Sequence, residues 1–117
     1  MAEKGDIFAF DQETPWEAAG EGIRRKVLCY DTGVMIVRVA FEAGAVGALH
    51  SHPHVQCSLV ESGEFDITIA GQRQRLRAGD SFLVPPDAVH GAEAIGPGVL
   101  VDVFTPMRED FIGPTKT

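Results

Sequence analysis

A chain of 117 residues is long enough for one domain with a single core, which at this size removes roughly two thirds of the unfolded surface from water. The composition, 44% hydrophobic and 23% charged, is that of an ordinary globular protein and excludes an intrinsically disordered chain. The formal net charge of -7 argues against nucleic acid and against an anionic membrane as partners. A small anionic substrate stays compatible with this charge, because a bound cation reverses the potential locally.

The N-terminal residues 1–6 lack the basic start and apolar run of a signal peptide, and no apolar run approaches the ~20 residues that span a membrane. We therefore expect a cytoplasmic protein. We also expect one domain over residues 1–117, with residues 1–22 as an N-terminal arm and residues 105–117 as a C-terminal tail that forms a turn or a single helical turn.

Short runs of β-forming residues, separated by Gly, Pro and Asp turns, follow one another along the chain. In the arm, residues 7–10 are expected to form a short edge strand and residues 13–20 an irregular segment. Asp31-Thr32-Gly33 joins two apolar runs and predicts a hairpin. Residues 64–69 alternate polar and apolar, and the arginine-rich residues 73–77 suit a sheet edge. Eight or nine such strands without a long helix predict an all-β sandwich or barrel.

Basic residues stand out at two places in the first half of the chain. Arg24-Arg25-Lys26 carries the densest positive charge, and we interpret it as a solvated strand entry rather than an anion site. Arg38 shares a strand face with Ile36 and Ala40. Two orientations stay open for Arg38, one toward solvent and one into a pocket.

The segment from Gly44 to Gly63 carries the residues that are most informative about chemistry. His50 and His52 are two apart, so on an extended strand both imidazoles leave the same face, roughly 7 Å apart at the backbone. Gln56 keeps this even spacing if the strand stays regular. Imidazoles and an amide oxygen suit a transition metal. His54 also shares the face, but Pro53 can bend the strand there, and we interpret His54 as a rim residue rather than a ligand.

The fourth ligand is expected to be His90, the only histidine outside that segment. A site of His50, His52, Gln56 and His90 contains only neutral ligands and leaves a divalent cation with its full charge. Such a centre favours an anionic oxygen from the substrate, such as a carboxylate or an enolate. The donor set suits nickel, zinc, iron, manganese or copper and does not select among them.

Two motifs now connect the chain to a known family. Gly44-x5-His50-x-His52-x3-Gln56-x6-Gly63, followed by Gly79-x5-Pro85-x-Asp87-x2-His90, resembles the paired motifs of the cupin superfamily. The resemblance implies a small jelly-roll β-barrel, also called a double-stranded β-helix, with a metal held inside by ligands at these positions. Gln56 replaces the frequent glutamate, which changes the charge of the site, and Asp87 stands where glycine is common.

The likeness narrows further near the C-terminus. His50-Ser51-His52-Pro53-His54-x-Gln56, the Gly79-Asp80-Ser81 turn and the ending from Asp102 to Phe111 are together similar to the KdgF-type pectin-degradation cupins. Members of that family linearise 4,5-unsaturated monouronates, released from pectin or alginate, into ketonised open-chain sugars. The resemblance implies that Asp102 and Arg108 are catalytic and that Phe104 and Arg108 bind the sugar acid. It also implies a homodimer.

Asp102 is also unusual by its position alone. It interrupts an apolar run and shares a strand face with Leu100 and Phe104, where a carboxylate is costly unless it is paired or used. It is therefore either a general acid/base beside the metal or a partner of Arg108 or Arg38. Three functions stay open: the uronate enzyme, another metallo-cupin such as an oxygenase or isomerase, and a non-catalytic binding module.

Overall fold

The structure, a computed structural model, describes residues 7–112, so the predictions for residues 1–6 and 113–117 lie outside the described range. In chain order the elements are η1 (Asp11–Glu13), β1 (Glu17–Gly20), β2 (Ile23–Asp31), β3 (Val34–Phe41), β4 (Val46–His50), β5 (Val55–Ser62), β6 (Glu64–Ile69), β7 (Gln72–Arg77), β8 (Ser81–Val84), β9 (His90–Ala94), β10 (Gly98–Thr105) and α1 (Glu109–Ile112). Within the described range, neither helical segment has the length or the apolar composition to cross a membrane.

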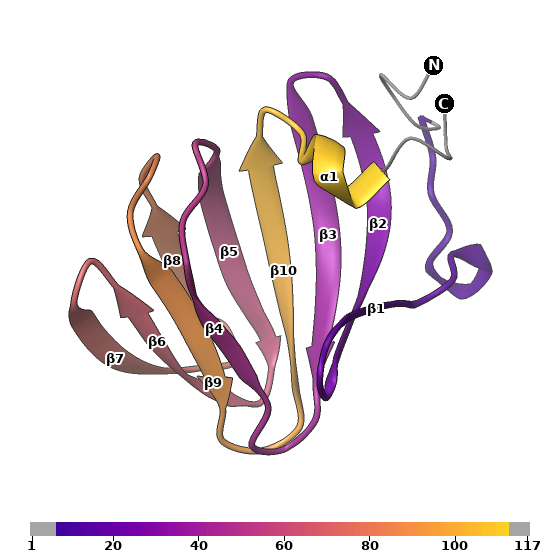
Figure 1. The fold of residues 1–117 in the computed structure, drawn as a ribbon. Helices are drawn as coiled ribbons and strands as arrows, with labels where there is room; N and C mark the ends of the chain where they lie inside the picture. The colour runs from indigo at the N-terminus through magenta and orange to yellow at the C-terminus, as the bar shows by residue number, and fades with distance from the viewer. Residues whose placement is uncertain (1–6, 113–117) are drawn as a thin grey trace.

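The strands form two antiparallel sheets, with strand orders β1-β2-β3-β10-β5-β8 and β4-β9-β6-β7 (Figure 1). β10 inserts between β3 and β5, and β9 inserts between β4 and β6, so strands distant in sequence become neighbours in both sheets. This arrangement confirms the predicted all-β jelly roll. The sheets are two separate ladders in the described residues and do not close into one continuous barrel.

Inward-facing side chains of the two sheets form the core. One buried cluster contains Ile23, Phe41, Val60, Phe65, Ile67, Ala94 and Leu100. Phe41 and Phe65 meet edge to face at 5.1 Å between ring centroids. A second cluster contains Met35, Val37, Phe104, Met107 and Ile112, which packs the C-terminal segment against the end of the larger sheet. In Figure 1, α1 lies at the end of that sheet where β10 also ends.

Several local predictions are confirmed. The hairpin at Asp31-Thr32-Gly33 joins β2 to β3, with Asp31 paired to Val34. Along β6, Phe65 and Ile67 are buried and alternate with partly exposed polar residues, as the amphipathic pattern predicts. The C-terminal segment contains the single helical turn α1.

The predicted edge strand at residues 7–10 is wrong, and the first strand is β1, within the segment that we expected to be irregular. Residues 7–10 have no strand pairing, whereas Glu17 of β1 pairs directly with Arg25 of β2. Before β1, the carboxylate of Asp11 binds Lys26 at 3.2 Å and Arg38 at 2.8 Å. Arg38 also binds Glu61 at 3.1 Å, so its partners are carboxylates away from the core.

The predicted continuous strand through His50 and Gln56 is also wrong. β4 ends at His50 in the smaller sheet, and β5 begins at Val55 in the larger sheet. Between them the chain crosses from one sheet to the other over residues 51–54, a passage that includes Pro53. Proline lacks the N–H that a continuing ladder needs, so a strand interruption is expected there.

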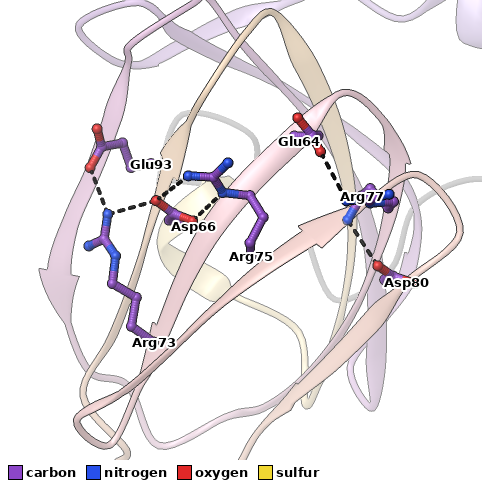
Figure 2. Close-up of polar contacts among 7 residues, drawn as sticks. All are labelled: Glu64, Asp66, Arg73, Arg75, Arg77, Asp80 and Glu93. Atoms are coloured by element: carbon purple, nitrogen blue, oxygen red, sulfur yellow. Dashed lines mark hydrogen bonds and ion pairs between the residues drawn. The ribbon is translucent and has the colours of Figure 1, made fainter.

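The edge strand β7 is covered by ion pairs on its outer face (Figure 2). Arg73 and Arg75 both donate to the carboxylate of Asp66 on β6, and Arg73 also lies 3.3 Å from Glu93 on β9. The hydrogen bond from Arg75 is the main cause that lowers the pKa of Asp66. Charged side chains at this exposed edge disfavour pairing with another chain, as the arginine-rich sequence predicted.

Two glycines flank β6, Gly63 before it and Gly71 after it, and they differ in how closely other backbone approaches them. Gly63 has a φ of +83°, and a Cβ added there would lie 2.6 Å from the Pro97 carbonyl oxygen. Gly71 has the same φ of +83° but nothing within 4 Å of an added Cβ. We expect Gly71→Ala to lower the free energy of unfolding by about 1–2 kcal/mol, because of the left-handed backbone alone, and Gly63→Ala to lower it further. Urea unfolding measures both, and equal losses would contradict the close approach.

The ion pairs of Asp66 predict a pH-dependent contribution to stability. A carboxyl with a lowered pKa stabilises the fold above its unfolded pKa of about 4, and this contribution is lost as the pH falls through the lower folded value. Asp66→Asn should therefore lower the urea midpoint at pH 7, and the difference from wild type should shrink as the pH is lowered below about 4.

Both proteins in that comparison are stripped of metal with a chelator, so that histidine protonation affects them equally. Glu93→Gln is the matched control, because it removes a single longer contact to Arg73 and should shift the midpoint less. A difference for Asp66→Asn that persists unchanged at pH 3 would show that its effect does not come from the charge.

Candidate metal centre

The four expected ligands come from both sheets and from the loop between them. His50, the last residue of β4, pairs directly with His90, the first residue of β9. His52 lies in the crossing loop, and Gln56 is the second residue of β5. The ligands converge because β4 and β9 are neighbours and the crossing loop leads from their end to the larger sheet.

Three histidines form a compact cluster. One ring nitrogen from each of His50, His52 and His90 lies within 4.8 Å of the other two. The ring centroids of His50 and His90 are 4.3 Å apart, and those of His52 and His90 are 4.7 Å apart. His52 and His90 are buried, whereas His50 faces solvent. The structure thus brings together the three imidazoles that the sequence spacing suggested.

Hydrogen bonds to the backbone fix the tautomer of all three rings. In His50, His52 and His90, Nδ1 lies 2.9, 3.2 and 2.9 Å from the carbonyl oxygen of a residue two positions away. A carbonyl oxygen only accepts, so Nδ1 carries the hydrogen and Nε2 keeps its lone pair. This is the arrangement in which a neutral histidine ligates a metal through Nε2.

The buried rings are prepared for a cation in two further respects. Burial lowers the pKa of both His52 and His90, which keeps their imidazoles unprotonated at neutral pH, as ligation requires. His90 Nε2 is buried and has no hydrogen-bond partner within residues 7–112. A buried polar atom without a partner is costly, and a metal ion would satisfy it.

The amide of Gln56 is oriented by a chain of hydrogen bonds. Gln56 Nε2 donates to Ser58 Oγ at 3.0 Å, and Ser58 Oγ donates to Asp102 Oδ1 at 2.6 Å. The amide oxygen is thereby turned to within 3.0 Å of His52 Nε2. Two lone-pair atoms facing each other repel unless they share a cation, and two ligands at about 2.1 Å from one ion and at a right angle lie about 3.0 Å apart. The donor set therefore fits a divalent transition metal.

We call His50, His52, Gln56 and His90 the four-ligand cluster. A cavity of about 380 Å³ lies beside it, within the usual range of small-molecule sites. The expected site residues that line this cavity are His50, Gln56, His90, Asp102, Phe104 and Arg108. The ring centroid of Phe104 lies 5.7 Å from that of His52.

Asp102 is held inside the sandwich without a salt bridge to any residue of the described range. It lies opposite Ser58 in the β10–β5 ladder, and only 8% of its surface is exposed. Burial raises the pKa of its carboxyl to about 6, although the hydrogen bond from Ser58 opposes this shift. Arg108 and Arg38, its two expected alternative partners, form ion pairs with other carboxylates. The salt-bridge alternative is therefore wrong.

Arg108 lies at the wall of the cavity. Its guanidinium carbon is 4.3 Å from the ring centroid of Phe111 and 5.2 Å from that of Phe104. Nε and one terminal nitrogen donate to the two carboxylate oxygens of Asp110, at 3.1 and 2.9 Å.

His54 is not one of the three clustered histidines, although its ring packs edge to face against that of His52, at 5.4 Å between ring centroids. Its Nε2 donates to the Met107 carbonyl oxygen at 3.1 Å, which ties the crossing loop to the segment that carries Arg108. Its Nδ1 is buried without a hydrogen-bond partner in the part of the chain that the structure describes.

Two residues of the site were missed by the sequence predictions. Ser58 continues the even spacing that links His52 and Gln56, so extending the alternation by one step would have found it. Arg25 lines the cavity, although its basic run was interpreted as solvated. That interpretation is wrong for Arg25 and also for Lys26, which is only 6% exposed. The signal for Arg25 was its alternation with the apolar Ile23 and Val27.

Comparisons with known proteins agree with this geometry. A family model described as a cupin domain matches residues 37–104. The pectin degradation protein KdgF of Dickeya dadantii (strain 3937) is 38% identical over 107 residues, which cover 90% of this chain and 97% of that protein. The structure of KdgF from Halomonas sp. has a TM-score of 0.87 and 36% identity, covering 92% of this chain and 99% of the other. An RmlC-like cupin from Shewanella frigidimarina NCIMB 400 has a TM-score of 0.91 and 41% identity, covering 93% and 98%.

The cluster predicts which histidine substitutions abolish metal binding. His90→Ala removes a buried ring nitrogen and should weaken affinity for the divalent ion by more than about 100-fold, beyond the 10–100-fold typical of outer-shell changes. Ser58→Ala should weaken the affinity by about 10–100-fold, because the Gln56 amide nitrogen loses the acceptor that orients it. Competition with a chelating dye measures these affinities.

His54→Ala is the matched control, because it removes a partly buried histidine of the same segment that lies outside the cluster. We expect it to keep metal affinity within about 10-fold of wild type. Equal losses for His54→Ala and His90→Ala would contradict the assignment of ligands.

Proposed function

The chain belongs to the cupin superfamily and is a homologue of KdgF, and on that basis we propose that it is a metal-dependent enzyme that converts 4,5-unsaturated monouronates into linear ketonised sugars. The alignment to KdgF covers 90% of this chain and 97% of that protein. The substrate class is taken from the resemblance to the KdgF family, in which these sugars are released from pectin or alginate.

One observation of the site carries this proposal. A buried carboxylate, Asp102, lines the same cavity as His50, Gln56 and His90 and is joined to Gln56 through Ser58. A carboxylate without a salt bridge, buried beside neutral metal ligands, suits proton transfer better than a structural role.

The reaction requires a proton to move without any redox change. The anomeric hydroxyl loses its proton, the anomeric carbon becomes an aldehyde as its bond to the ring oxygen breaks, and the electron pair of that bond stays on the ring oxygen. The resulting enolate becomes a ketone when carbon 4 gains a proton. We assign to Asp102 the removal of the first proton and its return at carbon 4, because burial already raises the pKa of this carboxyl to about 6.

The remaining site residues bind and orient the sugar. A divalent ion in the four-ligand cluster would supply a Lewis acid that stabilises negative charge on a substrate oxygen. Phe104 provides an apolar wall between Asp102 and the C-terminal segment, and Arg108 contributes a cation at that wall. Because the four ligands are neutral, a bound divalent ion would keep its full charge and would attract an anion to this region of an acidic protein.

Three parts of the proposal come from the resemblance and from the sequence: one domain over residues 1–117, a homodimer and a cytoplasmic location. Light scattering of the purified protein tests the dimer. None of the site assignments depends on these three parts.

Incubation with a 4,5-unsaturated galacturonate, combined with elemental analysis and NMR of the products, tests the activity. We expect metal-dependent formation of the open-chain keto sugar. Metal-loaded protein that leaves this substrate unchanged would contradict the proposed function, and oxygen-dependent turnover with iron would favour an oxygenase.

Asp102→Asn separates proton transfer from metal binding. The variant should retain its metal and its thermal transition but lose about 10²–10⁴-fold in kcat, which is the usual contribution of a general acid/base. Glu61→Gln is the control, because Glu61 lies exposed on the neighbouring strand β5 and binds Arg38. Wild-type turnover by a metal-loaded Asp102→Asn variant would refute the assigned role.

A further inference from the structure

The cavity beside the four-ligand cluster contains a second guanidinium group. Arg25 on β2 lies opposite Glu17 of β1 and Val39 of β3. It shares the inward face of the strand with the buried Ile23, and its side chain lines the cavity. Arg24 is exposed on the other face and lies over Trp16, at 4.6 Å from the ring centroid. The two adjacent arginines therefore have different environments.

Arg25 and Arg108 share one aromatic ring. The guanidinium carbon of Arg25 lies 3.8 Å from the ring centroid of Phe111, and that of Arg108 lies 4.3 Å from the same centroid. Stacking on an aromatic face stabilises a guanidinium and restricts its orientation. Two cations thus approach one ring at the edge of a small cavity, and each also binds one carboxylate, that of Glu17 for Arg25 and that of Asp110 for Arg108.

The two arginines differ in how many donors they have left. Arg108 uses Nε and one terminal nitrogen to bind both oxygens of Asp110. Arg25 uses only Nε, which donates to Glu17 at 3.0 Å, and its two terminal nitrogens have no hydrogen-bond partner among the described residues. Arg25 therefore keeps both terminal nitrogens available for the two oxygens of one carboxylate, whereas Arg108 shares one of its own with Asp110.

We propose that Arg25 binds the carboxylate of the substrate through its two terminal nitrogens and thereby selects sugar acids over neutral sugars. This inference rests on the proposed function and deepens it. Glu17 holds Nε of Arg25, and stacking on Phe111 restricts the plane of its guanidinium group. The two terminal nitrogens are then available to bind an anion. The side chain is only 22% exposed, so its charge is less screened than that of a fully solvated arginine.

The test uses the metal-loaded full chain and two stable probes, D-galacturonate and its uncharged methyl ester, with calorimetry as the binding assay. A charge-assisted hydrogen-bonded contact is worth about 1.5–3 kcal/mol, so wild type should bind the acid roughly 10- to 150-fold more tightly than the ester. Arg25→Met keeps an apolar contact with Phe111 and should abolish this preference, while binding the ester within about threefold of wild type.

Arg24→Met is the matched control, because it removes an arginine from the outer face of the same strand, and it should keep the full preference. Arg25→Lys retains the charge but lacks the fork, so it should show an intermediate preference and also guards against misfolding of Arg25→Met. Arg108→Met should weaken the binding of both probes but keep most of the preference for the acid. The reason is that Asp110 already binds two of the guanidinium nitrogens of Arg108.

Several results would overturn the inference. For Arg25→Met, these results are an unchanged preference for the acid over the ester, or an equal loss of affinity for both. For the other proteins, they are the absence of a preference in wild type, or a preference that disappears in Arg108→Met but not in Arg25→Met. Turnover of the unsaturated uronate by wild type is measured alongside. If wild type forms no product but the acid preference is present and is lost in Arg25→Met, the proposed reaction fails and the carboxylate site stands.

Discussion

The candidate site depends on the hydrogen-bond chain from Asp102 through Ser58 to Gln56. A carboxamide can present either its oxygen or its nitrogen, and only the oxygen can ligate a metal. Ser58 accepts from the amide nitrogen because its own hydrogen is donated to Asp102. The accepting oxygen of Asp102 therefore determines which end of Gln56 faces His52. The carboxylate proposed to transfer the proton and the candidate metal ligand Gln56 belong to one hydrogen-bond network.

Strand register makes this chain possible. β5 and β10 are neighbours in the larger sheet, with Gln56 opposite Phe104 and Ser58 opposite Asp102. A slip of one residue in either strand would turn the two side chains of that strand from the inner to the outer face. The histidines come from the smaller sheet and from the crossing loop, so the site lies where the two sheets face each other. Close approach of Gly63 and Gly98 to neighbouring backbone helps to fix the same ladder at its other end.

The sequence predicts those features that depend on alternation along one strand. The buried face of β6, the charged edge strand β7 and the common face of Asp102 and Phe104 all follow from a period of two. Prediction from the sequence fails where a strand is interrupted, because the alternation rule then no longer relates the residues on the two sides of the interruption. His50 and Gln56 belong to different sheets, and their convergence with His90 comes from the pairing of β4 with β9, which no spacing within the chain encodes. Arg25 was missed for a related reason, since the basic run was treated as one charged unit although alternation separates its two faces.

The site has two parts, one inside the cupin-domain match and one in the segments that flank it. Residues 37–104, which match the cupin domain, contain the four-ligand cluster, Asp102 and Phe104. Arg25, Arg108 and Phe111 lie outside this range and contact one another at the cavity wall. The shared fold thus supplies the candidate ligands and the carboxylate proposed to transfer the proton, while flanking segments from both ends of the chain supply the cations that would recognise an acid. Because this wall is joined to the ligand loop through His54 and the Met107 carbonyl, a change in the flanks can alter which substrate is accepted while leaving every metal ligand in place.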